Sequence, residues 1–109
     1  MSKLGDIWYR ADERWIDTGS EVYEGVTIAV VVWVVTKTTP QGVWLRCPTS
    51  LHLKPRWASV SSRVFAITRA EAIDKLIGRR TRQLRILQNQ LLVATDVLDA
   101  AKALRRTLS

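Results

Sequence analysis

The sequence has very few of the residues that build disulfide frameworks, metal sites or catalytic centres. Among its 109 residues there is one cysteine, Cys47, and one histidine, His52. A single cysteine excludes an internal disulfide, and together with one histidine it offers no cluster that resembles a zinc site. No glycine-rich phosphate loop is present, and carboxylate pairs such as Asp96 and Asp99 have a spacing that is common on solvated surfaces. We therefore expect a binding protein that is not an enzyme, with no catalytic residues, no metal and no cofactor.

Long apolar segments are also missing. The N-terminal residues 1–6 lack the apolar core of a signal peptide. The longest apolar run, residues 28–35, has eight residues, whereas a membrane-spanning helix needs roughly 20. We therefore expect no membrane association. A chain with one cysteine suits a reducing compartment, so we expect the protein in the cytosol.

Positive charge dominates and is concentrated after the first third of the chain. The formal net charge is +7, and residues 1–35 contain three basic and six acidic side chains, whereas residues 36–109 contain fourteen basic and four acidic ones. Such a chain either neutralises part of its own charge on folding or presents two poles to different partners. The length and the 47% hydrophobic content suit one globular domain over residues 1–109.

The first two-thirds of the chain predict a small antiparallel sheet. Residues 6–15 interleave aromatic and charged side chains and are typical of an opening strand. Residues 26–36 are so rich in β-branched side chains that they predict the central strand. The turn at residues 39–42, Thr-Pro-Gln-Gly, places proline and glycine where a tight turn favours them, and it closes a hairpin into residues 43–46.

The remainder of the sheet is less regular. Pro48 and Pro55 bracket residues 49–54, which we expect to form an irregular excursion with at most a short edge strand at residues 51–53. Residues 60–67 predict the last strand. The sheet therefore has about four strands in a meander, within residues 6–67.

Both faces of the central strand are apolar, which is unusual for an antiparallel strand with one solvated side. One face carries Val26, Ile28, Val30, Val32 and Val34, and the other carries Thr27, Ala29, Val31, Trp33 and Val35. Either the helix and loops cover both faces, or one face is left for a partner or a second copy. The sequence leaves both interpretations open.

A long helix follows the sheet. Thr68 and Glu71 have the spacing of a capping box, in which the Thr hydroxyl and the Glu carboxylate satisfy backbone amides at a helix start. No proline follows, so about 40 residues, 69–108, are expected to be helical over roughly 60 Å. The helix either extends beyond the sheet or bends near Gly78. The predicted fold class is α+β, a small antiparallel sheet followed by one long basic helix.

Apolar residues recur in this helix at spacings of three and four, as in a heptad repeat. The seam consists of Leu84, Leu87, Leu91, Ala94, Leu98 and Ala101; Ile77 extends it backward, and Ile86, Val93, Val97 and Leu104 widen it. One interpretation is a helix that folds back onto its own sheet. The other is a homodimer, in which the four leucines of the seam are the self-association residues.

A basic cluster lies at the start of the seam. Arg79, Arg80, Arg82 and Arg85 fall within about two helical turns. On a helical wheel, Arg79, Arg82 and Arg85 lie within about 120° of one another and form a basic ridge. The ridge suits phosphates or an acidic protein surface. A solvated helix face is the third interpretation of the same charge run.

Five tryptophans are many for a chain of this length, and we divide them by expected role. Trp33 lies within the central strand and is expected to be buried. Trp8, Trp44 and Trp57 are candidates for contact with a partner, either by stacking on bases or as hot spots of a protein interface.

Three blocks of sequence resemble a group of small phage and prophage proteins. They are residues 35–45, 63–72 and 78–87. In that group a Thr-Pro-x-Gly-Val-Trp-Leu hairpin precedes an Arg-x-Phe-Ala strand, a helix-capping threonine and a basic helix with an isoleucine-leucine pair. The sequence departs from the group at Ile67, where a proline is expected before the capping threonine. The resemblance implies a phage origin and gives no mechanism.

The leading functional prediction is a phage-encoded protein in the bacterial host cytosol that binds a host protein complex. By analogy with other compact phage proteins it would inhibit an anti-phage defence complex, in the manner of an anti-CRISPR protein, by stoichiometric occlusion. The first alternative is a nucleic-acid-binding accessory protein that uses the basic helix. The second alternative is a self-associating structural protein.

Overall fold

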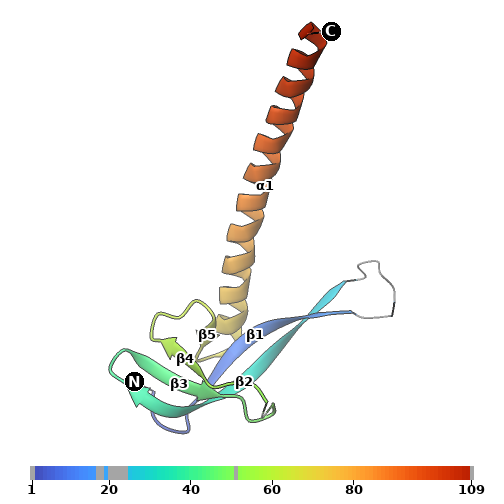
Figure 1. Ribbon diagram of the computed structural model, residues 1–109. Coiled ribbons are helices and arrows are strands. Elements are labelled where there is room, and N and C mark those ends of the chain that lie inside the picture. Colours follow the sequence, from blue (N-terminus) through green and yellow to red (C-terminus); the bar gives the residue numbers. More distant parts are fainter. Residues whose placement is uncertain (1, 17–18, 20–24, 51, 109) are drawn as a thin grey trace. The chain divides into compact units, whose positions relative to one another are not determined.

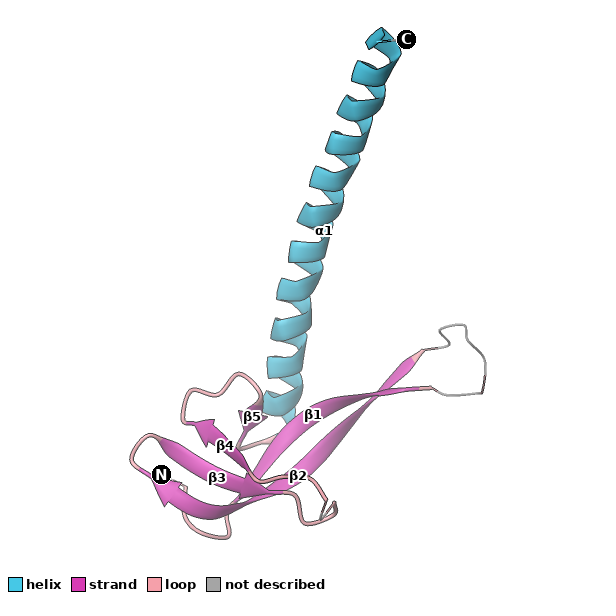
Figure 2. Ribbon diagram, in the orientation of Figure 1, coloured by secondary structure: helices cyan, strands magenta, loops and turns pink. Residues whose placement is uncertain are grey.

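The computed structural model describes residues 2–16, 19, 25–50 and 52–108. These residues form a five-stranded antiparallel sheet followed by a single long helix, which confirms the predicted α+β class (Figures 1 and 2). The segment Asp17-Thr-Gly-Ser-Glu has the composition of a loop, and apart from Gly19 it lies outside the described residues. Leu51, the first residue of the expected edge strand, also lies outside them. By its internal contacts the chain divides into two compact units, Met1–Ile77 and Gly78–Ser109.

The first four strands form a meander, and the fifth strand returns to pair with the first. Their bounds are β1, Ile7–Trp15; β2, Val26–Thr39; β3, Gly42–Arg46; β4, Arg56–Ser59; and β5, Phe65–Ala66. The spatial order is β4-β3-β2-β1-β5, so the last strand pairs with the first. Because β3 and β5 each pair with only one end of the β1–β2 hairpin, the other end of this hairpin continues as a two-stranded ribbon (Figure 1).

The predicted hairpin between β2 and β3 is confirmed. Thr39 lies directly opposite Gly42 across a turn made by Pro40 and Gln41. The Thr39 hydroxyl accepts a hydrogen bond from the Gly42 amide at 3.1 Å and donates one to the Gly42 carbonyl at 2.9 Å. This side chain therefore holds the turn closed in addition to the backbone pairing.

The prediction of one last strand over residues 60–67 is wrong. Within this segment only Phe65–Ala66, strand β5, is a strand, and the preceding strand β4 already ends at Ser59. The Ser62 hydroxyl accepts hydrogen bonds from the amides of Val64 and Phe65, each at 3.1 Å, and so holds a turn where the strand was expected. Residues 52–53 adopt a turn and a bend, so the described part of the expected edge strand is not a strand.

The two faces of β2 have different surroundings. The face with Trp33 and Val35 packs into the main core, where Trp33 meets Phe65 edge to face with ring centroids 5.3 Å apart. The buried members of this core are Trp8, Trp33, Val35, Val43, Leu45, Cys47, Ala58 and Phe65. The burial predicted for Trp33 is confirmed, and this face is the inner face of the sheet.

The opposite, outer face is covered over part of its length. Ala72 and Leu76, from the start of the helix, pack with Ala11 and Ala66 and with the ring of Tyr9. Farther along the ribbon, apolar side chains of the same face, including Val26 and Ile28, are more than 40% exposed. The outer face of β2 is therefore covered near the start of the helix and exposed along the ribbon, and a partner for the exposed part stays a prediction.

The helix α1 spans Arg69–Leu108 and begins at the predicted residue. The Glu71 amide donates a hydrogen bond to the Thr68 hydroxyl at 3.2 Å, which is the threonine half of the predicted capping box. The Lys75 ammonium donates to the Phe65 carbonyl at 2.7 Å and ties the second turn to β5. The helix runs through Gly78 without interruption.

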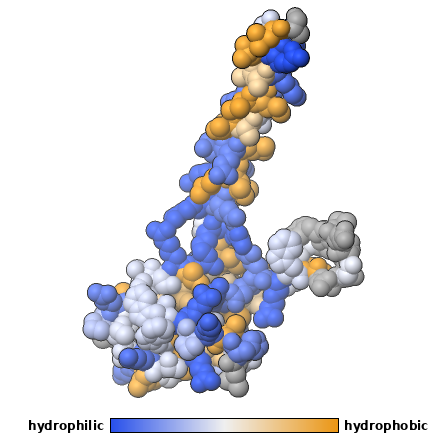
Figure 3. Space-filling model, viewed as in Figure 1, coloured by the Kyte–Doolittle hydropathy of each residue, from blue (hydrophilic) through white to orange (hydrophobic). Residues whose placement is uncertain are grey.

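The second unit, considered by itself, is a single exposed helix. Every described residue from Arg80 to Leu108 is exposed. Apolar side chains gather toward its C-terminal part, whereas hydrophilic ones dominate nearer its start (Figure 3).

Candidate binding surface on the outer face of β3 and β4

Two half-exposed tryptophans lie side by side on the outer face of the sheet. Trp44 of β3 is directly opposite Trp57 of β4. Because directly opposed residues of an antiparallel pair project from the same face, both indoles lie on one surface. They are 38% and 43% exposed, respectively, whereas their neighbours Val43 and Ala58 project inward and are buried.

Two cations flank this pair. Lys37 of β2 lies directly opposite Trp44, and Arg46 follows Trp44 by two positions on β3, so both project from the outer face. Both are exposed. We call Lys37, Trp44, Arg46 and Trp57 the tryptophan face. One row of this face, Lys37–Trp44–Trp57, crosses three neighbouring strands.

A β-bulge places Lys37 on this face. Val35 pairs with Leu45 and is buried, so a regular strand would also direct Lys37 inward. The register shifts between Val35 and Lys37, which leaves Thr36 as the extra residue. The shift turns Lys37 outward, opposite Trp44, which illustrates how a bulge redirects a side chain.

The Trp57 ring is held in place by the hairpin turn. A Cβ atom on Gly42 would lie 2.8 Å from Trp57 Cζ2, so the indole lies against the glycine backbone. Trp57 Nε1 donates a hydrogen bond at 3.4 Å to the same Thr39 hydroxyl that closes the turn. The indole of Trp57 is therefore oriented before any partner arrives, which lowers the entropy cost of binding.

The strands β2, β3 and β4 that carry the tryptophan face lie in a stretch of sequence whose charges have one sign. Residues 25–70 contain six basic side chains and no acidic one. In the part of the chain that the structure describes, neither Lys37 nor Arg46 forms an ion pair. The tryptophan face combines aromatic surface with positive charge, and this combination favours binding of an anionic partner that has planar rings.

The other predicted site residues are placed differently. Trp8 was expected to contact a partner, but it is 5% exposed and belongs to the main core, because it pairs with Trp33 on the inner face. Trp15, for which no contact role was predicted, is the most exposed tryptophan at 69% and lies at the far end of β1.

The four predicted arginines lie at the start of the second unit. Arg80, Arg82 and Arg85 are exposed, and Arg79 is partly exposed. Arg80 Nη1 donates a hydrogen bond to Gln83 Oε1. Their predicted role in partner binding stays a prediction.

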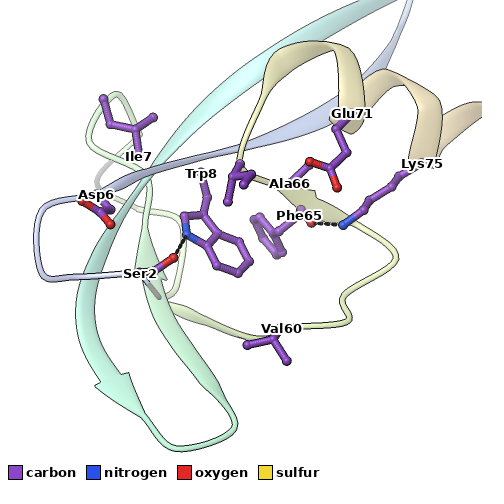
Figure 4. A pocket seen from close by; sticks show the side chains of 10 residues that line it. Ser2, Asp6, Ile7, Trp8, Val60, Phe65, Ala66, Glu71 and Lys75 are labelled. Carbon is purple, nitrogen blue, oxygen red and sulfur yellow. Dashed lines mark hydrogen bonds between the residues drawn. The ribbon is translucent and has the colours of Figure 1, made fainter.

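An open cavity of about 530 Å³ lies elsewhere in the first unit (Figure 4). Trp8 and Phe65 line it, and Asp6, Glu71 and Lys75 contribute its polar groups. Two of its polar groups are engaged within the protein: Trp8 Nε1 donates to Ser2 Oγ at 2.9 Å, and the Lys75 ammonium is bound to the Phe65 carbonyl. Apart from Trp8, this cavity brings together none of the predicted site residues.

No group of three or more His, Cys, Asp or Glu side chains is placed to hold a metal ion among the residues described. Cys47 is buried beside the Thr49 hydroxyl, with its sulfur 3.4 Å from Thr49 Oγ1. Within the described ranges, no helix combines the length and apolar character needed to traverse a bilayer.

Comparison with known proteins gives no matching family model, no matching curated protein and no matching solved structure. The resemblance to small phage proteins, and the role in inhibiting host defence that it suggests, therefore stay predictions.

Proposed function

We propose that the protein binds nucleic acid, in single-stranded form, through the tryptophan face. Bases stack on the exposed indoles of Trp44 and Trp57, and the phosphates between them meet Lys37 and Arg46. The observation that carries this proposal is the Lys37–Trp44–Trp57 row within a stretch of the chain that has six basic and no acidic residues. Aromatic platforms beside a cationic track are the usual means by which proteins bind unpaired strands.

Two features favour nucleic acid over the host protein complex that the phage resemblance suggested. Lysine is depleted in the buried centres of protein interfaces, yet Lys37 lies in the same row as the two tryptophans. An unpaired base also offers a flat face to each indole whatever its sequence. The exposed arginines at the start of the second unit supply further positive charge for the same kind of partner.

The test is a titration of a short single-stranded oligonucleotide, followed by its fluorescence anisotropy. Loss of one stacked base costs about 1–3 kcal/mol, so we expect Trp44→Ala to weaken binding by roughly 5- to 150-fold. Trp15→Ala is the matched control, because Trp15 is an exposed tryptophan at the other end of the β1–β2 ribbon. We expect the control to bind as the wild type does.

Two results would overturn the proposal. One is the absence of binding at low salt, and the other is an equal loss of affinity in both variants. A nuclease-treated pull-down from host lysate distinguishes the rival function. A defined host complex that is retained by the wild type and lost with Trp44→Ala would identify a protein-directed inhibitor that uses the same face.

A further inference from the structure

The exposed seam of the second unit carries an inference that is independent of the tryptophan face. The seam residues are Leu84, Leu87, Leu91, Ala94, Leu98 and Ala101, and its four leucines are each more than 50% exposed. A helix with an apolar stripe gains most of its stability when the stripe packs against another surface of the protein or of a partner. From the pattern along this seam, we infer that a second copy of the chain covers it, with the two helices antiparallel.

The area of the seam suits a stable pair. Burying one leucine removes roughly 60–120 Å² of apolar surface from water. The four leucines of the seam and the flanking Val97 and Leu104, both 62% exposed, therefore supply roughly 400–700 Å² per helix. The stems of neighbouring polar side chains add to this. The total approaches the roughly 800 Å² per partner that specific interfaces bury.

The seam is complementary to itself only when the second helix runs in the opposite direction. With Leu91 opposite Ala94 of the partner, Leu84 lies opposite Ala101 and Leu87 lies opposite Leu98. In this register each alanine of the seam faces a leucine, so no layer of the interface pairs two small side chains. A parallel pair in register would place Ala94 against Ala94 and Ala101 against Ala101, and these two layers would be underpacked.

Light scattering and sedimentation of the full chain over a concentration series test the association. We expect the wild type to form a dimer and Leu87→Asp to be a monomer with unchanged tryptophan fluorescence. Leu92→Asp is the matched control: Leu92 is also exposed, on the same helix, but lies about 130° from the centre of the seam at roughly 100° per residue. We expect this variant to remain a dimer.

Disulfide formation tests the direction of the helices. In a Cys47→Ser background, a mixture of Leu84→Cys and Ala101→Cys proteins should form a mixed disulfide under mild oxidation, whereas Leu84→Cys alone should not cross-link. Cross-linking of Leu84→Cys alone would overturn the antiparallel assignment.

A monomeric wild type, or an equal effect of Leu87→Asp and Leu92→Asp, would overturn the inference that a second copy covers the seam. A monomer whose seam binds vesicles of zwitterionic and anionic lipid would also overturn the inference, because a lipid surface would then cover the seam in place of a second copy.

Discussion

Gly42 is the residue whose substitution most directly tests the packing of β3 against β4. A Cβ atom at this position would lie 2.3 Å from the Ala58 carbonyl oxygen and 2.8 Å from Trp57 Cζ2. Ordinary contacts begin near 3.4 Å, so β4 would have to move by roughly 1 Å in a sheet packed at the density of a crystal. Overpacking of this kind costs about 1–3 kcal/mol.

We therefore expect Gly42→Ala to lower the free energy of unfolding of the first unit by about 1–3 kcal/mol, or roughly 4–8 °C in melting temperature per kcal/mol. Thermal denaturation followed by tryptophan fluorescence measures this unit alone, because all five tryptophans lie between residues 8 and 57. The same substitution displaces Trp57 from the tryptophan face, so oligonucleotide binding should weaken in parallel.

Gly78→Ala is the matched control for Gly42→Ala. Gly78 lies within α1, and a Cβ atom there meets nothing within 4 Å. Because alanine restricts the unfolded chain more than glycine and favours the helix, we expect a gain of about 0.5–1 kcal/mol in the stability of α1, measured by circular dichroism. If Gly42→Ala melted at or above the wild-type temperature, the described register of β3 and β4 would be wrong.

Three further sets of variants test the core, the helix start and the charge of the tryptophan face. Leu45→Ala, at a fully buried core position, should lower the free energy of unfolding by about 2–5 kcal/mol in denaturant titrations. Thr68→Ala should cost about 1 kcal/mol because it removes the cap of α1, whereas Thr68→Ser should have little effect. Lys37→Gln combined with Arg46→Gln should lower the slope of log affinity against log salt by roughly 1.4 for a single strand, and an unchanged slope would exclude phosphate contacts by these side chains.

The elements that sequence analysis predicted well are those set by local chemistry. The β-branched run at residues 26–36 forms most of β2, and the hairpin turn and the helix start were located correctly. In each case neighbouring side chains decide the backbone conformation: β-branched residues favour a strand, and the Thr39 and Thr68 hydroxyls bind amides three residues ahead.

The errors arose where distant segments decide the structure. β5 has two residues and exists because it pairs with β1, at Tyr9 and Arg10, which are more than 50 positions earlier in the chain. β4 is a short edge strand that needs β3 beside it. Hydrophobic pattern alone does not contain this information, so residues 60–67 were interpreted as one strand although Ser62 turns the chain within them.

The candidate site was predictable in composition but not in arrangement. Sequence analysis selected Trp44 and Trp57 correctly as exposed, but it included Trp8, whose face is fixed only by its pairing with Trp33. It did not identify Lys37, because the bulge at Thr36 reverses the side-chain alternation of β2. A bulge depends on how two strands pair, so neither strand reveals it alone.

The two proposals, taken together, predict that binding depends on the length of the nucleic acid. A pair of copies carries two tryptophan faces, and a strand long enough to reach both converts the second contact into an intramolecular one. Leu87→Asp should therefore weaken binding of long single strands by roughly 10-fold or more and leave binding of short ones unchanged. An equal affinity of wild type and variant for long strands, with the dimer present, would mean that the two faces of one pair cannot engage the same strand.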